Sequence, residues 1–291
     1  MHGFFHVNLQ SVATNILHET KKLQANHFMI YTIYQVDAFT DRLFGGNPAA
    51  VVPLKEWIDD ALMQKLAMEN NLSETVFFVP SNTTDADYEI RWFTPVLEIN
   101  LCGHATLASA FVLFNKLGYL KETIRFQYKS GLLSCIKRNG VIEMDFPAWK
   151  PEPAKEDYSN VIEALGRIPV EGIYKHRDVL VEVRGEELVR MCAPDFTLLK
   201  KIGEKVIITS RGNEVDFVSR FFAPVAGIDE DPVTGSAHSQ LIPFWAEKSG
   251  KNKFHAKQLS ERGGELWCQY LGERVTMAGK CVFYMKGEIE L

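Results

Sequence analysis

The sequence contains two copies of one pattern, separated by about half its length. Asp87–Val96 reads DYEIRWFTPV and Asp216–Val225 reads DFVSRFFAPV, so Asp, Arg, Phe and Pro-Val recur 129 positions apart. Repeats of about 20–50 residues build solenoids. A repeat of about 130 residues is long enough to form a domain. The pattern therefore predicts two similar domains related by a pseudo-twofold axis.

Two further matches support the duplication. Ser73–Val79 (SETVFFV) aligns with Gly203–Thr209 (GEKVIIT) at a separation of 130 residues. Cys102-Gly103 aligns with Thr234-Gly235 at a separation of 132 residues. The separation grows by three, which predicts that the second copy gained three residues near residues 229–232.

Each copy predicts strands and helices in mixed order. The segment Gly103–Gly118 is apolar almost all round and ends in glycine, as expected of a buried helix. Apolar spacing of three to four predicts a second helix over 56–71. In the second copy, the counterpart of the apolar helix at Gly103 contains Pro243, which predicts a kink there. Alternating or β-branched apolar residues predict strands at 30–39, 47–54, 75–80, 88–95, 123–129, 131–138 and 141–147.

The expected fold is α/β (α+β), with two pseudo-symmetric lobes that each curve a mixed sheet around one central apolar helix. We expect residues 1–28 to be an N-terminal extension. We expect the first lobe to span 29–147. The alternative is that a C-terminal strand from 282–291 also belongs to this lobe. The second lobe is expected to span 148–291, after a Pro-rich crossover at 146–158.

Charge and cysteine content exclude several classes of protein. The net charge of −5 does not favour binding to nucleic acid or to an anionic membrane. No apolar run approaches the roughly 20 residues that span a bilayer. The five cysteines are scattered without a C-x-x-C pair, which favours reduced thiols in the cytoplasm over a disulfide framework or a metal site.

The two predicted apolar helices both begin at glycine, at Gly103 and Gly235. A helix start carries unpaired N–H groups and about half a positive charge, so it attracts anions. Pseudo-twofold symmetry would bring both starts into one cleft, which predicts a site for a small carboxylate. The alternative is that Thr234 and Ser236 simply cap their helix.

Three ionisable residues near these starts are candidates for acid–base chemistry. His104 lies in the first turn of one helix, where it can relay a proton or serve only a structural role. Asp231 precedes the other helix, where it is either functional or a turn residue. Glu74 opens an apolar strand, which suits general acid–base catalysis, although a solvent-edge carboxylate is the simpler reading. Its counterpart Glu204 is expected to be such a solvent-edge residue.

Five motifs resemble the phenazine-biosynthesis PhzF-like family: DAFTDRLFGGNPAAVV, NNLSETVFF, RWFTP, LCGHATLASA and EDPVTGSAH. The resemblance covers residues 29–291. That family is similar in fold to diaminopimelate epimerase and proline racemase, which implies barrel-like lobes with the site between them. It also implies isomerisation of a dihydro-hydroxyanthranilic acid by proton transfer without a cofactor. The matching residues imply catalytic roles for Glu74, His104, Asp231 and Ser236, and ligand-facing positions for Asn47, Gly103, Thr234 and Gly235.

The related epimerases and racemases use two cysteines, one from each lobe. Cys102 holds one such position, but Thr234 holds the other, so we expect Cys102 to be a small helix-start residue. The sequence thus predicts a cofactor-independent isomerase of a small anionic substrate. It also predicts a homodimer, because two-fold dimers are the commonest oligomers. An amino-acid epimerase and a non-catalytic ligand-binding protein remain the alternatives.

Overall fold

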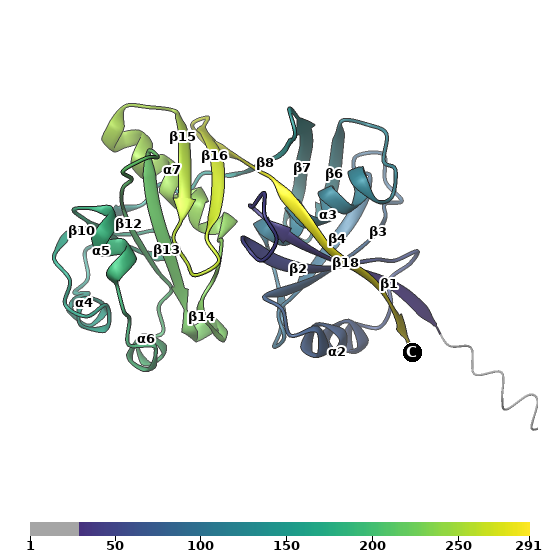
Figure 1. Cartoon of the computed structure of the whole chain (residues 1–291), viewed down its shortest axis with the longest axis horizontal. Helices are drawn as coiled ribbons and strands as arrows, with labels where there is room; N and C mark the ends of the chain where they lie inside the picture. The colour runs from purple at the N-terminus through teal and green to yellow at the C-terminus, as the bar shows by residue number, and fades with distance from the viewer. Residues whose placement is uncertain (1–28) are drawn as a thin grey trace, which may run out of the picture.

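The computed structural model describes residues 29–291; the expectation for residues 1–28 lies outside this range. Figure 1 shows two lobes side by side, with the earlier part of the chain and the C-terminal strand in one and the rest of the later part in the other. We call residues 29–147, together with the C-terminal strand 281–290 that pairs with the first strand, the first lobe, and residues 148–280 the second lobe. None of the helices in the described part of the chain combines the length and the hydropathy needed to cross a membrane.

The first lobe follows the predicted order of elements closely. Its elements are β1 (Ile30–Ala38), β2 (Asn47–Pro53), α2 (Asp60–Asn70), β3 (Glu74–Pro80), β4 (Tyr88–Phe93), β5 (Glu98–Ile99), α3 (Gly103–Asn115), β6 (Thr123–Tyr128), β7 (Gly131–Arg138) and β8 (Val141–Pro147).

The second lobe repeats this order with extra short helices. Its elements are β9 (Glu152–Pro153), α4 (Ser159–Ala164), β10 (Val170–Lys175), β11 (Val179–Val183), α5 (Glu186–Met191), α6 (Phe196–Ile202), β12 (Val206–Arg211), β13 (Phe217–Ala223), the 3-10 helix η1 (Pro224–Ala226), β14 (Ile228–Glu230), α7 (Gly235–Ser249), β15 (Lys253–Gln258), β16 (Gly264–Tyr270) and β17 (Arg274–Gly279). The last strand, β18 (Cys281–Glu290), returns to the first lobe and pairs with β1.

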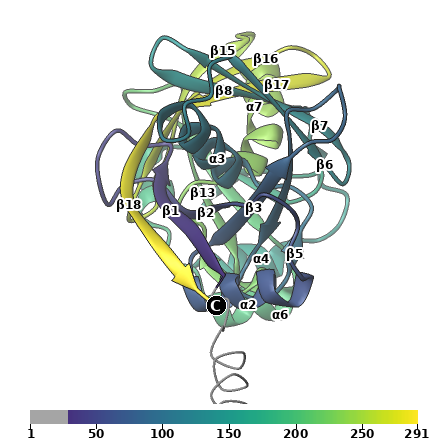
Figure 2. The same cartoon turned by 90° about the vertical axis from the view of Figure 1, so that its right-hand side faces the viewer.

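Each lobe wraps its sheet around one buried helix. Figure 2 shows α3 enclosed by strands of the first lobe. Buried residues occur on every face of α3, including Leu107, Val112 and Leu113. Full burial of such a side chain contributes about 1.5–3 kcal/mol. This explains why α3 and α7 lack the polar face of an ordinary surface helix.

The strand pairings of the two lobes match. In each, a parallel pair (β2–β3, β11–β12) leads into an antiparallel pair (β3–β4, β12–β13) and then a parallel pair (β4–β6, β13–β15). Matched arginines also make matched bidentate ion pairs. Arg91 binds Glu98 with both N···O distances at 2.8 Å, and Arg220 binds Glu230 with both at 2.7 Å. The internal duplication is therefore visible in topology and in side-chain contacts.

The structure corrects the position of the three extra residues. Phe93 pairs with Glu98 in the first lobe, and Phe222 pairs with Glu230 in the second. Glu230 is thus the counterpart of Glu98, and the additional residues lie between Val225 and Glu230. Asp231 follows the insertion and is not part of it.

The register of β12 corrects a second match. Phe77 pairs with Arg91 across β3–β4, whereas Ile208 pairs with Arg220 across β12–β13. The strand β12 is therefore shifted by one residue from the sequence match. As a result, the counterpart of Glu74 is Lys205 and not Glu204.

Pro243, where the sequence predicts a kink, lies inside α7, which runs from Gly235 to Ser249 as one helix. Proline cannot donate a hydrogen bond to the carbonyl four residues earlier, here that of Ser239. The backbone N–H of Trp149 donates to this carbonyl instead, at 2.8 Å. The proline thus provides an attachment point for the crossover between the lobes.

Candidate active site

A cavity of about 530 Å³ lies at the starts of α3 and α7 and is lined by residues of both lobes. Seven of the eight predicted site residues line it: Glu74, Gly103, His104, Asp231, Thr234, Gly235 and Ser236. The eighth, Asn47, is fully buried and is not among the lining residues. The structure thus gathers residues that are up to 162 positions apart in the sequence.

The two helix starts touch at their glycines. A Cβ built on Gly103 would lie 3.0 Å from Gly235 Cα, and a Cβ on Gly235 would lie 3.0 Å from Gly103 Cα. Glycine is required here by the approach of one backbone to the other. Two positively polarised helix ends therefore meet at the cavity, which favours a negative charge beside them.

The alternative that Thr234 caps α7 is wrong. Neither Thr234 nor Cys102 makes a side-chain capping hydrogen bond at its helix. Thr234 Oγ1 donates to Asp231 Oδ2 at 2.5 Å, and Ser236 Oγ accepts from Arg177 Nη2 at 3.1 Å. The first-turn N–H groups of both helices are therefore not capped by these side chains.

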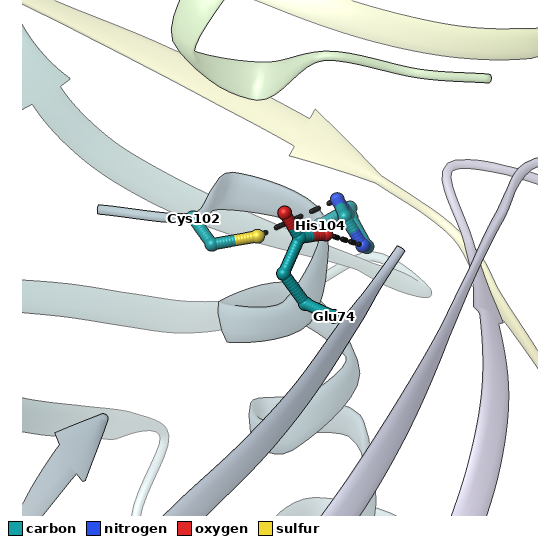
Figure 3. A group of neighbouring side chains, drawn as sticks. All are labelled: Glu74, Cys102 and His104. Carbon is teal, nitrogen blue, oxygen red and sulfur yellow. Dashed lines mark hydrogen bonds and ion pairs between the residues drawn. The ribbon is translucent and has the colours of Figure 1, made fainter. Parts of the chain in front are cut away.

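Glu74 and His104 form the acidic–basic pair of the cavity (Figure 3). Glu74 Oε2 lies 3.0 Å from His104 Nε2, and both side chains are at least nine-tenths buried. The two atoms are close, but their directions do not satisfy hydrogen-bond geometry, and neither has another hydrogen-bond partner among the described residues. Unpaired buried polar atoms are costly, so this pair is suited to bind polar atoms of a ligand.

The pKa of His104 is raised well above its ordinary value. Burial alone lowers this pKa, but negative charge on Cys102 and Glu74 raises it by more. Burial and the Glu74 charge raise the pKa of the Cys102 thiol to about 11, so this thiol is neutral near pH 7. Because the thiol is neutral, the Glu74 carboxylate is the charge that raises the His104 pKa.

Asp231 is the second carboxylate of the site, and the buried Asn47 side chain binds it through a hydrogen bond. Asn47 Nδ2 donates to Asp231 Oδ1 at 2.7 Å and to the Val233 carbonyl at 3.0 Å, and it lies 3.1 Å from His104 Nδ1. Asn47 thus positions two cavity residues, which differs from the ligand-facing position expected of it. Gln258, which the sequence did not indicate, donates to the Asp231 carbonyl at 2.7 Å.

Replacing Asp231 with asparagine should change the pH dependence of stability. Burial raises the Asp231 pKa from 3.8 to about 6; the charge of His104 opposes this increase, and the charge of Glu74 adds to it. Asp231 thus contributes stability that is fully present below pH 3.8 and lost as the pH rises through about 6. Asparagine does not ionise, so the variant does not lose this stability. The free energy of unfolding of Asp231→Asn, relative to that of wild type, should therefore increase by about 1–3 kcal/mol from pH 4 to pH 8. Urea unfolding at several pH values measures this, and a pH-independent difference would contradict it.

Arg177 and Trp149 form a part of the wall that no motif indicated. Both line the cavity, and the Arg177 guanidinium carbon lies 4.8 Å from the centre of the Trp149 ring. Arg177 stands in a turn and Trp149 in the crossover, and only the tertiary fold brings them to Ser236. No local sequence signal marks them.

Glu74, Cys102 and His104 offer possible metal ligands within 4.8 Å of one another. However, Glu74 Oε2 faces His104 Nε2, while Cys102 Sγ lies 3.5 Å from Nδ1 (Figure 3). A metal ion binds a histidine through one ring nitrogen, and zinc sites place their ligands tetrahedrally around one point. These three residues face two different nitrogens and do not fit such a site.

Comparisons with known proteins show which family the chain is similar to. The profile of the phenazine biosynthesis-like protein family, PhzC–PhzF, matches residues 36–287. An uncharacterized isomerase from Pseudomonas aeruginosa is 48% identical over 264 residues, which cover 90% of this chain and 100% of that protein. The crystal structure of a PhzF-family phenazine biosynthesis protein from Enterococcus faecalis is 44% identical, with a TM-score of 0.85, over 90% of this chain and 100% of that one.

The fold extends to more distant proteins. A hydroxyproline epimerase from Agrobacterium vitis matches with a TM-score of 0.63 at 11% identity, over 90% of this chain and 93% of that one. This likeness concerns the fold alone, and it confirms the expected two-lobed, epimerase-like fold class. The family profile spans most of the chain, and the relatives match over their full length. The chain therefore belongs to the phenazine biosynthesis-like (PhzC–PhzF) family.

Proposed function

We propose that this protein is a cofactor-independent isomerase that moves a proton between two atoms of a small carboxylate-bearing substrate. The observation that carries the proposal is the Glu74 carboxylate, 3.0 Å from His104 Nε2, at a cavity where two helix starts meet. The relative from Pseudomonas aeruginosa that is named an isomerase supports the same class of reaction.

In this proposal Glu74 removes a proton from carbon and returns it to another atom of the same substrate. The helix starts at Gly103 and Gly235 stabilise the negative charge of the substrate carboxylate and of the deprotonated intermediate. His104, whose pKa the Glu74 carboxylate raises, donates a hydrogen bond or a proton to the substrate. Asp231 and Ser236 orient the substrate within the cavity.

The test is uptake of solvent deuterium into candidate substrates, followed by NMR. Small cyclic and linear amino and hydroxy acids, including the dihydro-hydroxyanthranilic acid, form the panel. The proposal expects exchange at carbon that depends on Glu74. Binding of a carboxylate without any exchange across the panel would instead favour the non-catalytic ligand-binding alternative.

An epimerase with a cysteine base is the other alternative, and Cys102→Ala separates it. The Cys102 thiol is protonated near pH 7, and Thr234 occupies the place of a second cysteine while donating to Asp231. We therefore expect Cys102→Ala to keep proton transfer within about threefold of wild type, as for a residue outside the chemistry. The same deuterium assay checks this, and a loss of exchange would point to thiol chemistry.

A further inference from the structure

The second-lobe side of the cavity carries two cationic side chains, Arg177 and Lys205, that the proposed proton transfer does not use. Within residues 29–291, Lys205 makes no ion pair, unlike the lysines that pair with acidic neighbours. An unpaired cation at the wall of a partly buried cavity favours a negatively charged ligand. The question is which part of the substrate it binds.

Lys205 is the pseudo-symmetric counterpart of Glu74. The registers of β3–β4 and β12–β13 relate these two residues, as the same pairing relates Phe77 and Ile208. The starts of α3 and α7 are related in the same way, so His104 corresponds to Ser236. The duplicated site therefore presents a carboxylate and an imidazole on one side, and an ammonium and a hydroxyl on the other.

Arg177 adds to the cationic side in a fixed orientation. Its Nε and Nη2 bind the buried Asp178 carboxylate, and Nη2 also donates to Ser236 Oγ at 3.1 Å. Gln240 holds the Asp178 backbone through hydrogen bonds of 3.2 and 2.9 Å. Nη1 has no acceptor among the described residues, so this part of the guanidinium can donate to a ligand without breaking a contact.

The charges on this side match a single carboxylate. Asp178 neutralises Arg177, and Asn47 and Thr234 donate hydrogen bonds to the Asp231 carboxylate, whose pKa burial raises to about 6. The Lys205 charge and the partial charge of the α7 start remain to bind a ligand. On the other side the Glu74 carboxylate is paired with His104, so that side offers no free positive charge to a substrate carboxylate. The apolar residues Ile99, Tyr128 and Phe221 line the same cavity and suit the hydrocarbon part of the ligand.

We propose that the two copies of the site have different roles. In the second lobe, Lys205, Arg177 Nη1 and the α7 start bind the substrate carboxylate. In the first lobe, Glu74 and His104 face the carbon that loses its proton. The substrate class is a carbon acid whose carboxylate lies at the opposite end from the reacting carbon. This inference rests on the proposed function only for the role of Glu74. The carboxylate site itself stands on the charges and contacts of the second lobe.

The test compares benzoate with benzamide, which has nearly the same shape and no charge. Dissociation constants are measured by ligand-observed NMR titration on the full chain. We expect wild type to bind benzoate about 10- to 100-fold more tightly than benzamide. Lys205→Met should reduce benzoate binding by a similar factor and leave benzamide binding unchanged. Arg177→Met tests the same wall independently, and Lys201→Met, an exposed lysine of α6 that is not among the lining residues, is the matched control.

The outcomes separate this inference from the proposed function. Wild type that binds benzoate no better than benzamide, or a Lys205→Met variant that keeps the full preference, overturns the carboxylate site. Glu74→Gln should keep or increase the preference for benzoate, because it removes a negative charge from the cavity. If Glu74→Gln keeps full proton transfer while Lys205→Met loses the preference, the proposed function fails and the carboxylate site stands.

Discussion

Glu74→Gln should fold as wild type does but transfer protons from carbon about 10²–10⁴-fold more slowly, the usual contribution of a positioned general base. The amide is close in shape to the carboxylate and cannot accept the proton. Since Glu74 raises the His104 pKa, the variant should also lower that pKa. Deuterium uptake measures the first effect, and NMR titration of the His104 imidazole measures the second.

The matched control is Glu204→Gln, at the position that the sequence pairs with Glu74. Glu204 makes an ion pair with Lys175 at 2.5 Å and is not part of the cavity wall. Its substitution should leave proton transfer unchanged. A Glu74→Gln protein with wild-type exchange rates would show that another group removes the proton.

Gly103→Val should lower both stability and activity because it separates the two helix starts. Even the first carbon of the new side chain would lie 3.0 Å from Gly235 Cα, and the valine methyl groups would need still more room. Overpacking of this kind costs about 1–3 kcal/mol. A displacement of catalytic groups by about 1 Å lowers the rate by about 10²-fold. Urea unfolding and the deuterium assay measure the two effects.

Further variants make this prediction specific to the glycine contact. A Cβ on Gly185 meets nothing within 4 Å, and its φ of −157° is accessible to any residue, so Gly185→Ala should be nearly neutral. Gly103→Ala and Gly235→Ala press on the same contact, so their effects should not add in the double variant. Additive effects would mean that the two glycines do not act through each other.

The sequence predicted the duplication, the mixed sheets and the two apolar helices, because those patterns extend over many residues. It failed on the register of β12 for a physical reason. The residues of β12 from Val206 to Ser210 are buried on both faces, so the strand has no alternation that would fix its match to β3. A shift of one residue exchanged Lys205 for Glu204 and hid the charge reversal between the lobes.

The candidate site was predicted where motifs place residues near a helix start, as at His104 and Ser236. Arg177 and Trp149 were missed because each stands alone in an irregular segment. Their place at the cavity depends on Asp178 being held by Gln240 and on Trp149 donating to the Ser239 carbonyl that Pro243 leaves free. Such long-range contacts have no local pattern in the sequence.

The path of the chain between the lobes has a mechanical consequence. The chain crosses once after Pro147 and once after Gly279, where β18 leaves the second lobe to pair with β1. Between these crossings β8 and β17 form one antiparallel ladder, from the Pro147–Arg274 pair to the Ile142–Gly279 pair, about 17 Å long. Two covalent connections at opposite ends of a ladder prevent the lobes from moving apart along a straight line. We therefore expect the cavity to widen by rotation of the lobes about this ladder, as about a hinge, because that motion keeps the ladder intact.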